Sequence, residues 1–342
     1  MEEHGVAPRD EAPAAEAVMD EYEAARTGAV VADRAERVFL RAYGRDPVRM
    51  LQGLITNDLA GAPEGRGVYA AFLTPKGRMI ADAWLFRVAG GEALLELDAA
   101  AAPGLREHLK RSVPPLFARF EEAPLAALGV YGPRAAEVVR AVLGAVPPGD
   151  AAEGESVAGT WGGAEWRIVR SLETGEPGGY ELIGAAESAP GVREALVAAG
   201  ARPAGPGTLE VLRIEAGRPR WGAELDETVL PLEAGLKERA ISTTKGCYTG
   251  QEVVIRILHR GHVNRHLRGV LLGDAPAPAR GAPLVRPADG KVVGTVTAAC
   301  ASPRLGQTIA LAYVRREVEP GGAVRVGVDG DEGRVVEPPF PA

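Results

Sequence analysis

The sequence predicts an α+β protein whose C-terminal part is a small antiparallel β-barrel. Apolar residues alternate in some segments and recur at helical spacing in others, in an irregular order that does not suit a βαβ series. After Val263 the helical spacing ends, and short alternating runs flank the turn dipeptides Asp289-Gly290 and Asp329-Gly330. Closing such strands into a barrel would leave no exposed strand edge.

Length and composition are those of a globular protein with more than one core. The chain has 342 residues, of which 46% are hydrophobic and 25% are charged. Its 39 basic and 46 acidic residues give a net charge of −7, which argues against general nucleic-acid binding. Two cysteines do not make a disulfide framework, so we expect a reducing, cytoplasmic setting. No segment reaches the ~18 consecutive apolar residues of a membrane span, and we expect no signal peptide.

Apolar spacing also predicts the order of elements before the barrel. We expect residues 1–28 to be an acidic, largely disordered tail, in which a short helix ends near Gly28. Asp46-Pro47 marks a helix start, because aspartate suits the N-cap and proline the first helical position. Alternation predicts strands at 36–44, 92–98, 116–121, 125–131, 166–170 and 180–183. Helical spacing predicts helices at 103–113, 132–143, 192–199, 208–216 and 251–260.

A long hairpin is predicted over residues 68–87. Its strands flank Thr74-Pro75-Lys76-Gly77, where proline and glycine suit a tight turn. On the second strand, Asp82 shares a face with Trp84 and Phe86 by period-two alternation. A lone carboxylate among apolar side chains is costly unless it has a partner. Asp82 is therefore hydrogen-bonded internally, turned outward at an edge, or placed to bind a ligand.

The most distinctive stretch is the octapeptide at 245–252, Lys-Gly-Cys-Tyr-Thr-Gly-Gln-Glu. Thr249 suits an N-cap, and Glu252 lies three residues later, where a capping box has its carboxylate. Cys247 would then lie just outside the positive end of a helix, two residues from Lys245, and both features favour the thiolate. The alternative is that Cys247 is a small buried hydrophobe, as most free cysteines are.

Residues Arg256–Arg268 contain four arginines, three histidines and no acid. This run is a solvated helix face and turn, or the mouth of a site for an anionic ligand such as a polyglutamate tail or RNA. Besides these histidines only Cys300 could add a ligand, and its proximity is unknown from sequence. We therefore expect no metal site.

The octapeptide resembles the signature of the YgfZ family of folate-binding proteins. These are relatives of the glycine-cleavage T-protein, an aminomethyltransferase that uses tetrahydrofolate. The segments 51–58, 73–82 and 212–217 resemble blocks of the wider superfamily, and 302–312 resembles its C-terminal barrel. The resemblance implies a ring of three domains around a central folate channel. It divides this chain into the tail at 1–28, two interleaved α+β domains at 29–262, and the barrel at 263–342.

Site residues follow from the same resemblance, position by position. Asp82 matches the acidic residue near the reactive nitrogens of folate, and Glu181 resembles the carboxylate that pairs with the pterin ring. Arg213 resembles the arginine of the third block and would pair with Glu181 or with a ligand oxygen. The octapeptide contributes Cys247 as a functional thiol. Its other motif residues are Lys245, Gly246, Tyr248, Gly250, Gln251 and Glu252.

Two functions are therefore compared. In the first, a YgfZ-like protein binds tetrahydrofolate or a one-carbon derivative and supports iron–sulfur enzymes or their assembly factors through Cys247. In the alternative, the protein is a folate-dependent aminomethyltransferase or demethylase that acts on a small amine. The alternative needs Asp82 in an electrostatic or acid–base role and does not need the thiol. Whether the chain catalyses a reaction is left open by the sequence.

Overall fold

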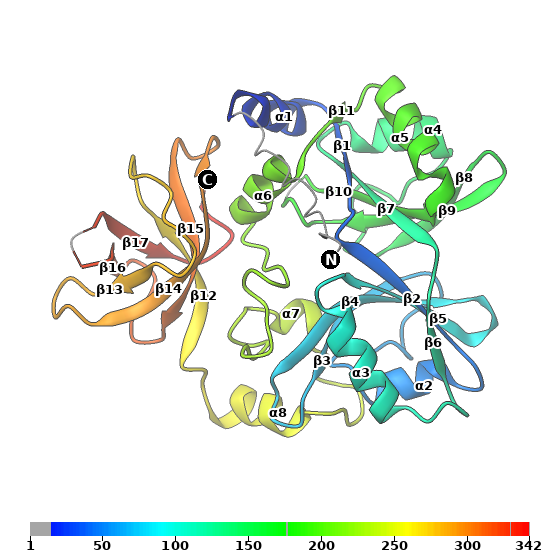
Figure 1. Ribbon diagram of the computed structural model, residues 1–342, viewed down its shortest axis with the longest axis horizontal. Coiled ribbons are helices and arrows are strands. Elements are labelled where there is room, and N and C mark those ends of the chain that lie inside the picture. Colours follow the sequence, from blue (N-terminus) through cyan, green and yellow to red (C-terminus); the bar gives the residue numbers. More distant parts are fainter. Residues whose placement is uncertain (1–14, 176, 329, 342) are drawn as a thin grey trace, which may run out of the picture.

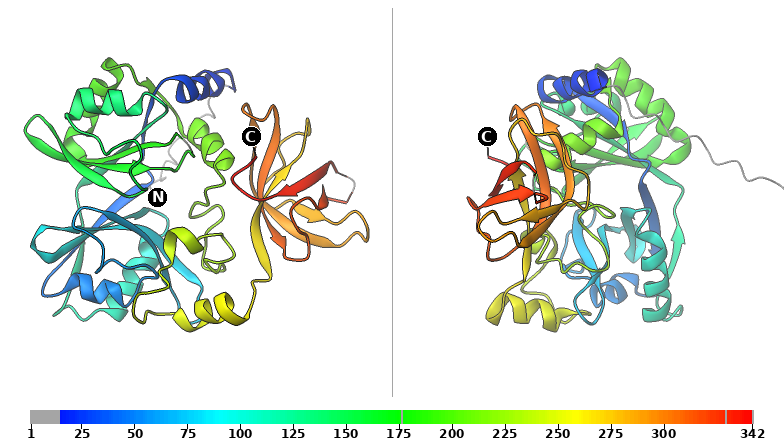
Figure 2. Two further views of the ribbon diagram at one scale, coloured as in Figure 1. Left: turned by 180° about the vertical axis from the view of Figure 1, so that it is seen from behind. Right: turned by 60° about the vertical axis from the view of Figure 1, so that its left-hand side comes forward.

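The structure is a computed structural model, and it describes residues 15–175, 177–328 and 330–341. Two open sheets and one closed barrel surround a common centre, with the barrel on the left of Figure 1 and the sheets on the right. The view from behind in Figure 2 shows the same three-part ring. The α+β class and the C-terminal barrel predicted from the sequence are confirmed.

The six-stranded sheet combines strands from distant parts of the sequence. Its members are β1 (Val30–Asp33), β7 (Leu125–Tyr131), β8 (Ser156–Trp161), β9 (Ala164–Ser171), β10 (Gly179–Ala185) and β11 (Arg202–Pro203). They lie in the order β11-β1-β7-β10-β9-β8. Only β1 and β11 pair in parallel, and the other pairs are antiparallel.

The five-stranded sheet is built from the intervening segment. Its members are β2 (Arg37–Tyr43), β3 (Gly67–Leu73), β4 (Met79–Val88), β5 (Glu92–Asp98) and β6 (Arg119–Glu122). They lie in the order β3-β4-β5-β2-β6, and every pair is antiparallel. The predicted hairpin is confirmed, with Gly77 at φ +75° in its turn. Because β1 and β2 join different sheets, the two sheets are interleaved along the chain.

The barrel closes through antiparallel pairing of its first and last strands. Its members are β12 (Arg265–Leu271), β13 (Pro283–Val285), β14 (Val292–Ser302), β15 (Gln307–Arg315), β16 (Ala323–Val326) and β17 (Glu332–Val336). The predicted Asp289-Gly290 turn joins β13 to β14. The second predicted turn joins β16 to β17, and its Asp329 lies outside the described residues.

Helices cover the sheets and connect the three units. They are α1 (Ala15–Thr27), α2 (Pro47–Gln52), α3 (Ala102–Ser112), α4 (Ala135–Leu143), α5 (Ala189–Ala198), α6 (Pro206–Glu215), α7 (Lys237–Ala240) and α8 (Gln251–Arg260), with short 3₁₀ turns η1 (Ala89–Gly91) and η2 (Ala186–Ser188). Asp46 caps α2 as predicted, accepting a hydrogen bond from the Arg49 N–H at 3.3 Å. None of the described helices is long and apolar enough to cross a membrane.

The segment before residue 29 contains the short helix that the sequence predicted. Residues 1–14 lie outside the described residues, but 15–27 form α1. Tyr22 and Ala25 on this helix are 5% and 4% exposed, and Tyr22 donates a hydrogen bond to Glu215 at 2.7 Å. The short helix expected to end near Gly28 is confirmed, since α1 ends at Thr27. Its apolar face is covered by α6.

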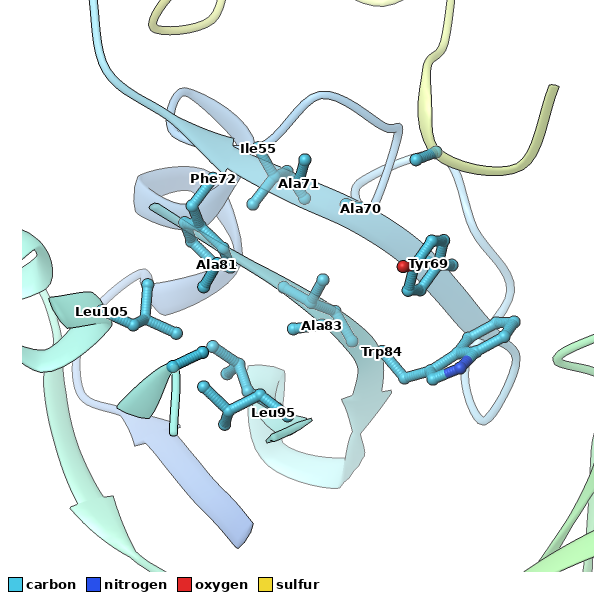
Figure 3. Close-up of a cluster of buried hydrophobic side chains, with 14 of the residues drawn as sticks. Ile55, Tyr69, Ala70, Ala71, Phe72, Ala81, Ala83, Trp84, Leu95 and Leu105 are labelled. Atoms are coloured by element: carbon cyan, nitrogen blue, oxygen red, sulfur yellow. The ribbon is translucent and has the colours of Figure 1, made fainter. Parts of the chain in front are cut away.

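A large apolar core packs against the five-stranded sheet and extends toward the barrel. Figure 3 shows Phe72, Ala81, Leu95 and Leu105 packed together from β3, β4, β5 and α3. Tyr313 of the barrel belongs to the same cluster. This shared core holds the strands that carry the candidate site.

Candidate functional site

A cavity of about 470 Å³ lies where the two open sheets meet α6 and the segment after it. We call it the Asp82 cavity. Its lining is strongly charged and includes aromatic side chains from both sheets. The lining residues that carry the argument below are Arg34, Arg37, Tyr69, Asp82, Tyr131, Glu173 and Arg213.

Asp82 is the buried carboxylate of this cavity, as its place on an apolar strand suggested. Its side chain is in β4, and the residue is 7% exposed. The Tyr69 hydroxyl donates a hydrogen bond to its Oδ2 at 2.8 Å. Among the described residues, nothing donates a hydrogen bond to its buried Oδ1. Of the alternatives that the sequence offered, internal hydrogen bonding holds for Oδ2 alone, because Oδ1 is buried without a donor among the described residues.

Neighbouring groups act on the protonation of Asp82. Burial raises the pKa of its carboxyl, and the negative charge of Glu173 raises it further, whereas the Arg37 guanidinium and the Tyr69 hydrogen bond lower it. The net effect is a raised pKa. Asp82 therefore retains a proton at a higher pH than an exposed aspartate, as a general acid or base requires.

Tyr69 is held in place by packing on both sides. Its ring centroid lies 5.4 Å from that of Trp84, and Figure 3 shows the two rings side by side on β3 and β4. The Arg239 guanidinium lies over the Tyr69 ring, 4.5 Å from its centroid. The hydroxyl that orients Asp82 is thus fixed by an aromatic contact and a cation–π contact.

Glu181 lies behind the cavity wall rather than on it. It is 7% exposed, and its Oε1 accepts hydrogen bonds from the Arg34 guanidinium and the Tyr131 hydroxyl, both of which line the cavity. Burial raises the pKa of the Glu181 carboxyl, and Arg34 opposes that effect. Its Oε2 is buried, and none of the described residues donates a hydrogen bond to it.

Gly129 makes room for this arrangement. It lies opposite Glu181 in the pairing of β7 with β10. A Cβ at Gly129 would clash with the ring and hydroxyl of Tyr131. A side chain at that position would therefore push Tyr131 away from Glu181.

The predicted pairing of Arg213 with Glu181 is wrong. Arg213 is buried on α6, and its Nε and Nη2 donate to the two oxygens of Glu210 at 3.0 and 2.6 Å. Its Nη1 donates to Glu224 at 2.8 Å and to the Arg218 carbonyl at 2.5 Å. Arg213 therefore lines the cavity while its guanidinium is engaged by protein acceptors.

Three functional candidates were missed by sequence reasoning. Arg34 and Tyr131 bind Glu181, and Glu173 lines the cavity in the turn between β9 and β10. The sequence did contain a sign of Tyr131, because this tyrosine ends a buried strand and lies two residues after a glycine, Gly129. The pairing joins Arg34, just after β1, to Glu181 of β10, far apart in sequence, and no local pattern marks it.

The octapeptide at 245–252 is held against the unit of the five-stranded sheet. The Lys245 ammonium donates to the carbonyls of Gln52, Ile55 and Asn57 at 2.6, 2.6 and 2.9 Å. Gly250 has φ +82°, and a Cβ there would lie 2.6 Å from the Thr74 carbonyl of the β3–β4 turn. Close backbone approach explains this glycine.

The expected setting of Cys247 is only partly correct. Helix α8 begins at Gln251 as predicted, but Gly250 occupies the N-cap, and no side chain caps the helix. The capping box of Thr249 and Glu252 is therefore wrong, because the left-handed turn at Gly250 displaces Thr249 from the cap. Cys247 is exposed, and the ammonium of Lys245 is turned to the three carbonyls described above.

The remaining motif residues also lie away from the site. Tyr248 is buried, Gly246 and Glu252 are exposed, and Gln251 is half-buried. Neither the octapeptide nor its Cys247 contributes to the described lining of the Asp82 cavity. The sequence placed the thiol near the folate channel, and the structure does not bring Cys247 and Asp82 to this one cavity.

A second cavity, of about 720 Å³, adjoins the first and shares Thr174 and Pro219 with it. We call it the basic cavity, because six basic side chains line it: Arg26, Arg218, Arg239, His266, Arg268 and Arg304. The run at Arg256–Arg268 is thus divided, since α8 exposes its first half while His266 and Arg268 face the basic cavity. Within the described residues, no group of three or more His, Cys, Asp or Glu side chains is arranged to hold a metal ion.

Comparison with known proteins gives matches along most of the chain. The GCVT N-terminal domain matches residues 5–245, and the glycine cleavage T-protein C-terminal barrel domain matches residues 265–341. An aminomethyltransferase of Moorella thermoacetica is 32% identical over 94% of this chain and 89% of its own length. One of Geobacillus kaustophilus is 32% identical over 94% of this chain and 90% of its own length.

A solved structure has the same fold. The glycine cleavage system aminomethyltransferase T from Bartonella henselae superimposes with a TM-score of 0.84 at 22% identity, over 95% of this chain and 89% of that one. These matches confirm the superfamily that the sequence resembles, while the narrower YgfZ assignment stays a prediction. The chain belongs to the glycine cleavage T-protein family.

Proposed function

We propose that this protein is a tetrahydrofolate-dependent transferase that takes a one-carbon unit from an aminomethyl donor. The observation that carries the proposal is Asp82, a buried carboxylate with an unpartnered oxygen at the cavity where the two open sheets meet. Relatives named aminomethyltransferase match along 94% of the chain. Aminomethyltransferases of this family use tetrahydrofolate as their one-carbon carrier.

The residues present fit a reduced folate. A cavity of about 470 Å³ is within the range of ~300–1,000 Å³ that small-molecule sites occupy. A pterin ring presents N–H and amino donors along one edge, and carboxylates are its natural acceptors. Asp82 Oδ1 and Glu181 Oε2 are buried acceptors that lack a donor among the described residues. Asp82 would accept from the ring beside Tyr69, while Glu181, behind the cavity wall, would act through Arg34 and Tyr131, which it positions.

The chemistry divides between the carrier and the protein. Tetrahydrofolate, when bound, supplies the nitrogens that accept the one-carbon unit. Asp82 holds or moves a proton at its Oδ1, and the Tyr69 hydroxyl keeps Oδ2 in a fixed orientation. Burial of the carboxylate excludes water and strengthens its interaction with a cationic donor.

The adjoining basic cavity suits the anionic end of the same ligand. Arg26 lines it and forms no ion pair among the described residues, and His266, whose pKa is lowered by burial and by Arg268, adds a neutral imidazole that can form hydrogen bonds. A glutamyl chain is polyanionic, so we expect it to extend from the Asp82 cavity toward these side chains. The sequence weighed RNA as another anion for the run at Arg256–Arg268, and that alternative stays a prediction.

Tetrahydrofolate affinity tests the binding site directly. Glu181→Gln is expected to raise the Kd for tetrahydrofolate about 10–100-fold, because Arg34 and Tyr131 lose charge-assisted hydrogen bonds, about 1.5–3 kcal/mol each, that hold them at the cavity wall. Titration calorimetry of wild type, Glu181→Gln and Asp82→Asn measures it. The matched control is Glu165→Gln, an exposed carboxylate on β9. Unchanged affinity in both site variants would contradict the folate site.

Substitution of Cys247 distinguishes the transferase function from the iron–sulfur alternative, and that alternative stays a prediction. Because Cys247 is exposed and contributes nothing to the described lining of the Asp82 cavity, Cys247→Ala is expected to change turnover by less than about twofold, the effect of an ordinary surface substitution. Formation of methylenetetrahydrofolate by the purified variant measures this.

The same variant in cells tests the alternative. Iron–sulfur enzyme activity that is lost with Cys247→Ala, while turnover and folate affinity persist, would favour the YgfZ-like role. A turnover that disappears with the thiol would contradict the acid–base role given to Asp82 alone. Serine at position 247 is the matched control for size.

A further inference from the structure

We propose that Lys245 is a positioning residue for the Asp82 cavity and acts on it through Asn57 and Tyr69. This role rests on the transferase function proposed above. It gives the octapeptide at 245–252 a part in that function, although none of its residues is in the described lining of the cavity. Lys245 touches no ligand in this role. Its ammonium is a tethered cation that fixes the loop at 53–58, between α2 and β3.

The ammonium of Lys245 is held by three backbone carbonyls, which we call the carbonyl cradle. An ammonium group has three N–H donors and no acceptor. This side chain donates to the carbonyls of Gln52, Ile55 and Asn57 at 2.6, 2.6 and 2.9 Å. The Tyr248 ring lies against the same ammonium, with its centroid 5.1 Å from Nζ. Donors and carbonyls match in number, so no donor is left for a ligand or for the neighbouring thiol.

The carbonyl cradle selects a positive charge. Burial lowers the pKa of the Lys245 ammonium to about 8, and the Asp58 carboxylate opposes that effect. An apolar side chain would avoid this cost of burial, but it would leave three carbonyls without these donors. Carbonyl oxygens hold the ammonium as they hold a potassium ion in a channel filter, where they replace its shell of water. A free potassium ion should therefore be able to occupy the carbonyl cradle when the lysine is removed.

Asn57 carries the effect of the carbonyl cradle to the site. Its own carbonyl is one of the three that Lys245 holds. Its side-chain amide donates to two other carbonyls, those of Tyr69 at 2.9 Å and Arg239 at 3.1 Å. The Tyr69 hydroxyl orients Asp82, and the Arg239 guanidinium lies over the Tyr69 ring. A displacement of Asn57 therefore reaches two of the groups that fix Asp82.

A separate anchor keeps the same loop folded. The hydroxyl of Thr56 donates to the Ala240 carbonyl at 2.5 Å and accepts from the Ala71 N–H at 2.9 Å. Because this anchor does not involve Lys245, loss of the lysine is expected to shift the loop locally rather than to unfold it. The effect on the site can then be measured in a folded protein.

Lys245→Ala is expected to lower kcat for one-carbon transfer about tenfold, while the KM for tetrahydrofolate stays within about threefold. The reason is that a small misplacement of a catalytic group slows the chemical step by at least this much, and the ligand contacts are unchanged. Steady-state formation of methylenetetrahydrofolate measures both constants.

The pH profile gives the readout that a purely structural role would not change. Arg37, Tyr69 and Glu173 act on the Asp82 carboxyl, and the hydrogen bond from Tyr69 lowers its pKa. A weakened bond raises that pKa, so the limb of kcat/KM that Asp82 sets should move to higher pH by about 0.5 pH unit. The profile is measured below pH 8, where the ammonium of the wild type mostly keeps its proton.

Potassium tests whether the missing cation is the cause. In Lys245→Ala, potassium chloride should restore kcat and the position of the limb. Tetramethylammonium chloride at the same ionic strength should not, because its methyl groups keep the carbonyls away from the charge. Asn57→Ala removes the next contact and leaves the backbone carbonyls in place, so it should shift the limb and should not respond to potassium. Lys110→Ala, at an exposed position of α3, is the matched control and should behave as the wild type in both salts.

Each result decides for or against the role of Lys245. A wild-type kcat with an unmoved limb in Lys245→Ala would overturn it, and so would a limb that is shifted equally in both salts. A lower midpoint temperature of unfolding with an unmoved limb would make Lys245 merely structural. If Lys245→Ala does not fold, Asn57→Ala decides, because an unmoved limb there would also overturn the role. A wild-type protein that transfers no one-carbon unit would contradict the proposed function itself, so the two failures are distinguishable.

Discussion

Replacing Asp82 with asparagine is expected to lower the turnover number for one-carbon transfer about 10²–10⁴-fold, the range lost with a general acid or base. Asparagine has the same size and its amide oxygen accepts the Tyr69 hydroxyl, but it carries no titratable proton. The substitution also removes a buried charge, so the midpoint temperature of unfolding should rise at neutral pH. Steady-state kinetics and thermal denaturation of the same preparation measure both effects.

The pH dependence of kcat/KM and of stability in the wild type should show the same role of Asp82. If Asp82 acts as a base, kcat/KM falls tenfold per pH unit as the pH drops through its raised pKa. Because the folded-state pKa exceeds the unfolded one, the folded protein binds more protons between those two values, and stability falls as the pH rises through that window. The stability advantage of Asp82→Asn should therefore vanish below the unfolded pKa.

A surface variant shows whether these effects are specific to Asp82. Glu122→Gln, at an exposed position of β6, should leave turnover unchanged and should change the free energy of unfolding by no more than about 0.5 kcal/mol. Turnover in Asp82→Asn that equals the wild type would remove Asp82 from the mechanism.

Replacing Arg213 with methionine is expected to lower the free energy of unfolding by about 3–5 kcal/mol. The reason is Glu224, which is 1% exposed and whose Oε2 accepts from Arg213 Nη1. Its other oxygen already lacks a donor among the described residues. Without Arg213, the carboxylate would be buried with no countercharge. Urea denaturation followed by circular dichroism measures the loss.

The double variant Arg213→Met/Glu224→Met separates this structural role from ligand binding. Removing both charges should recover part of the lost stability, because no buried charge is left unpaired. The tetrahydrofolate affinity of folded Arg213→Met should stay within about threefold of the wild type. A tenfold weaker affinity at unchanged stability would instead support the contact with a ligand oxygen that the family resemblance implied.

Local chemistry explains why much of the fold could be predicted. The Thr74–Gly77 turn, the Asp46-Pro47 helix start and the barrel hairpins depend on residues that are neighbours in sequence, and all three are found. β8 was missed because an edge strand of small residues next to a Pro- and Gly-rich loop has little alternation. The pairing of β1 with β7 and β11 depends on residues distant in sequence, and no short pattern encodes it.

In the candidate site, too, features set by neighbouring residues could be predicted, and features set by distant residues could not. Asp82 could be found because a carboxylate on an apolar strand face is costly, a fact visible in one strand. The partners of Glu181 and Arg213 could not, because each pair forms only after sheets and helices from separate segments have packed. Glu173 was hidden for a related reason. Its ionisation depends on arginines contributed by three different segments of the chain, at 34–37, 218 and 239.

The interleaving of the two open sheets has a consequence for synthesis on the ribosome. Strands β2 to β6 are contiguous enough for the five-stranded sheet to form early, whereas β1 must wait for β7 and then β11 to emerge. At about 5–20 residues per second, that delay is on the order of ten seconds. Until β7 emerges, the strand Val30–Asp33 has no partner, and its second edge stays unpaired until residue 203 has left the exit tunnel.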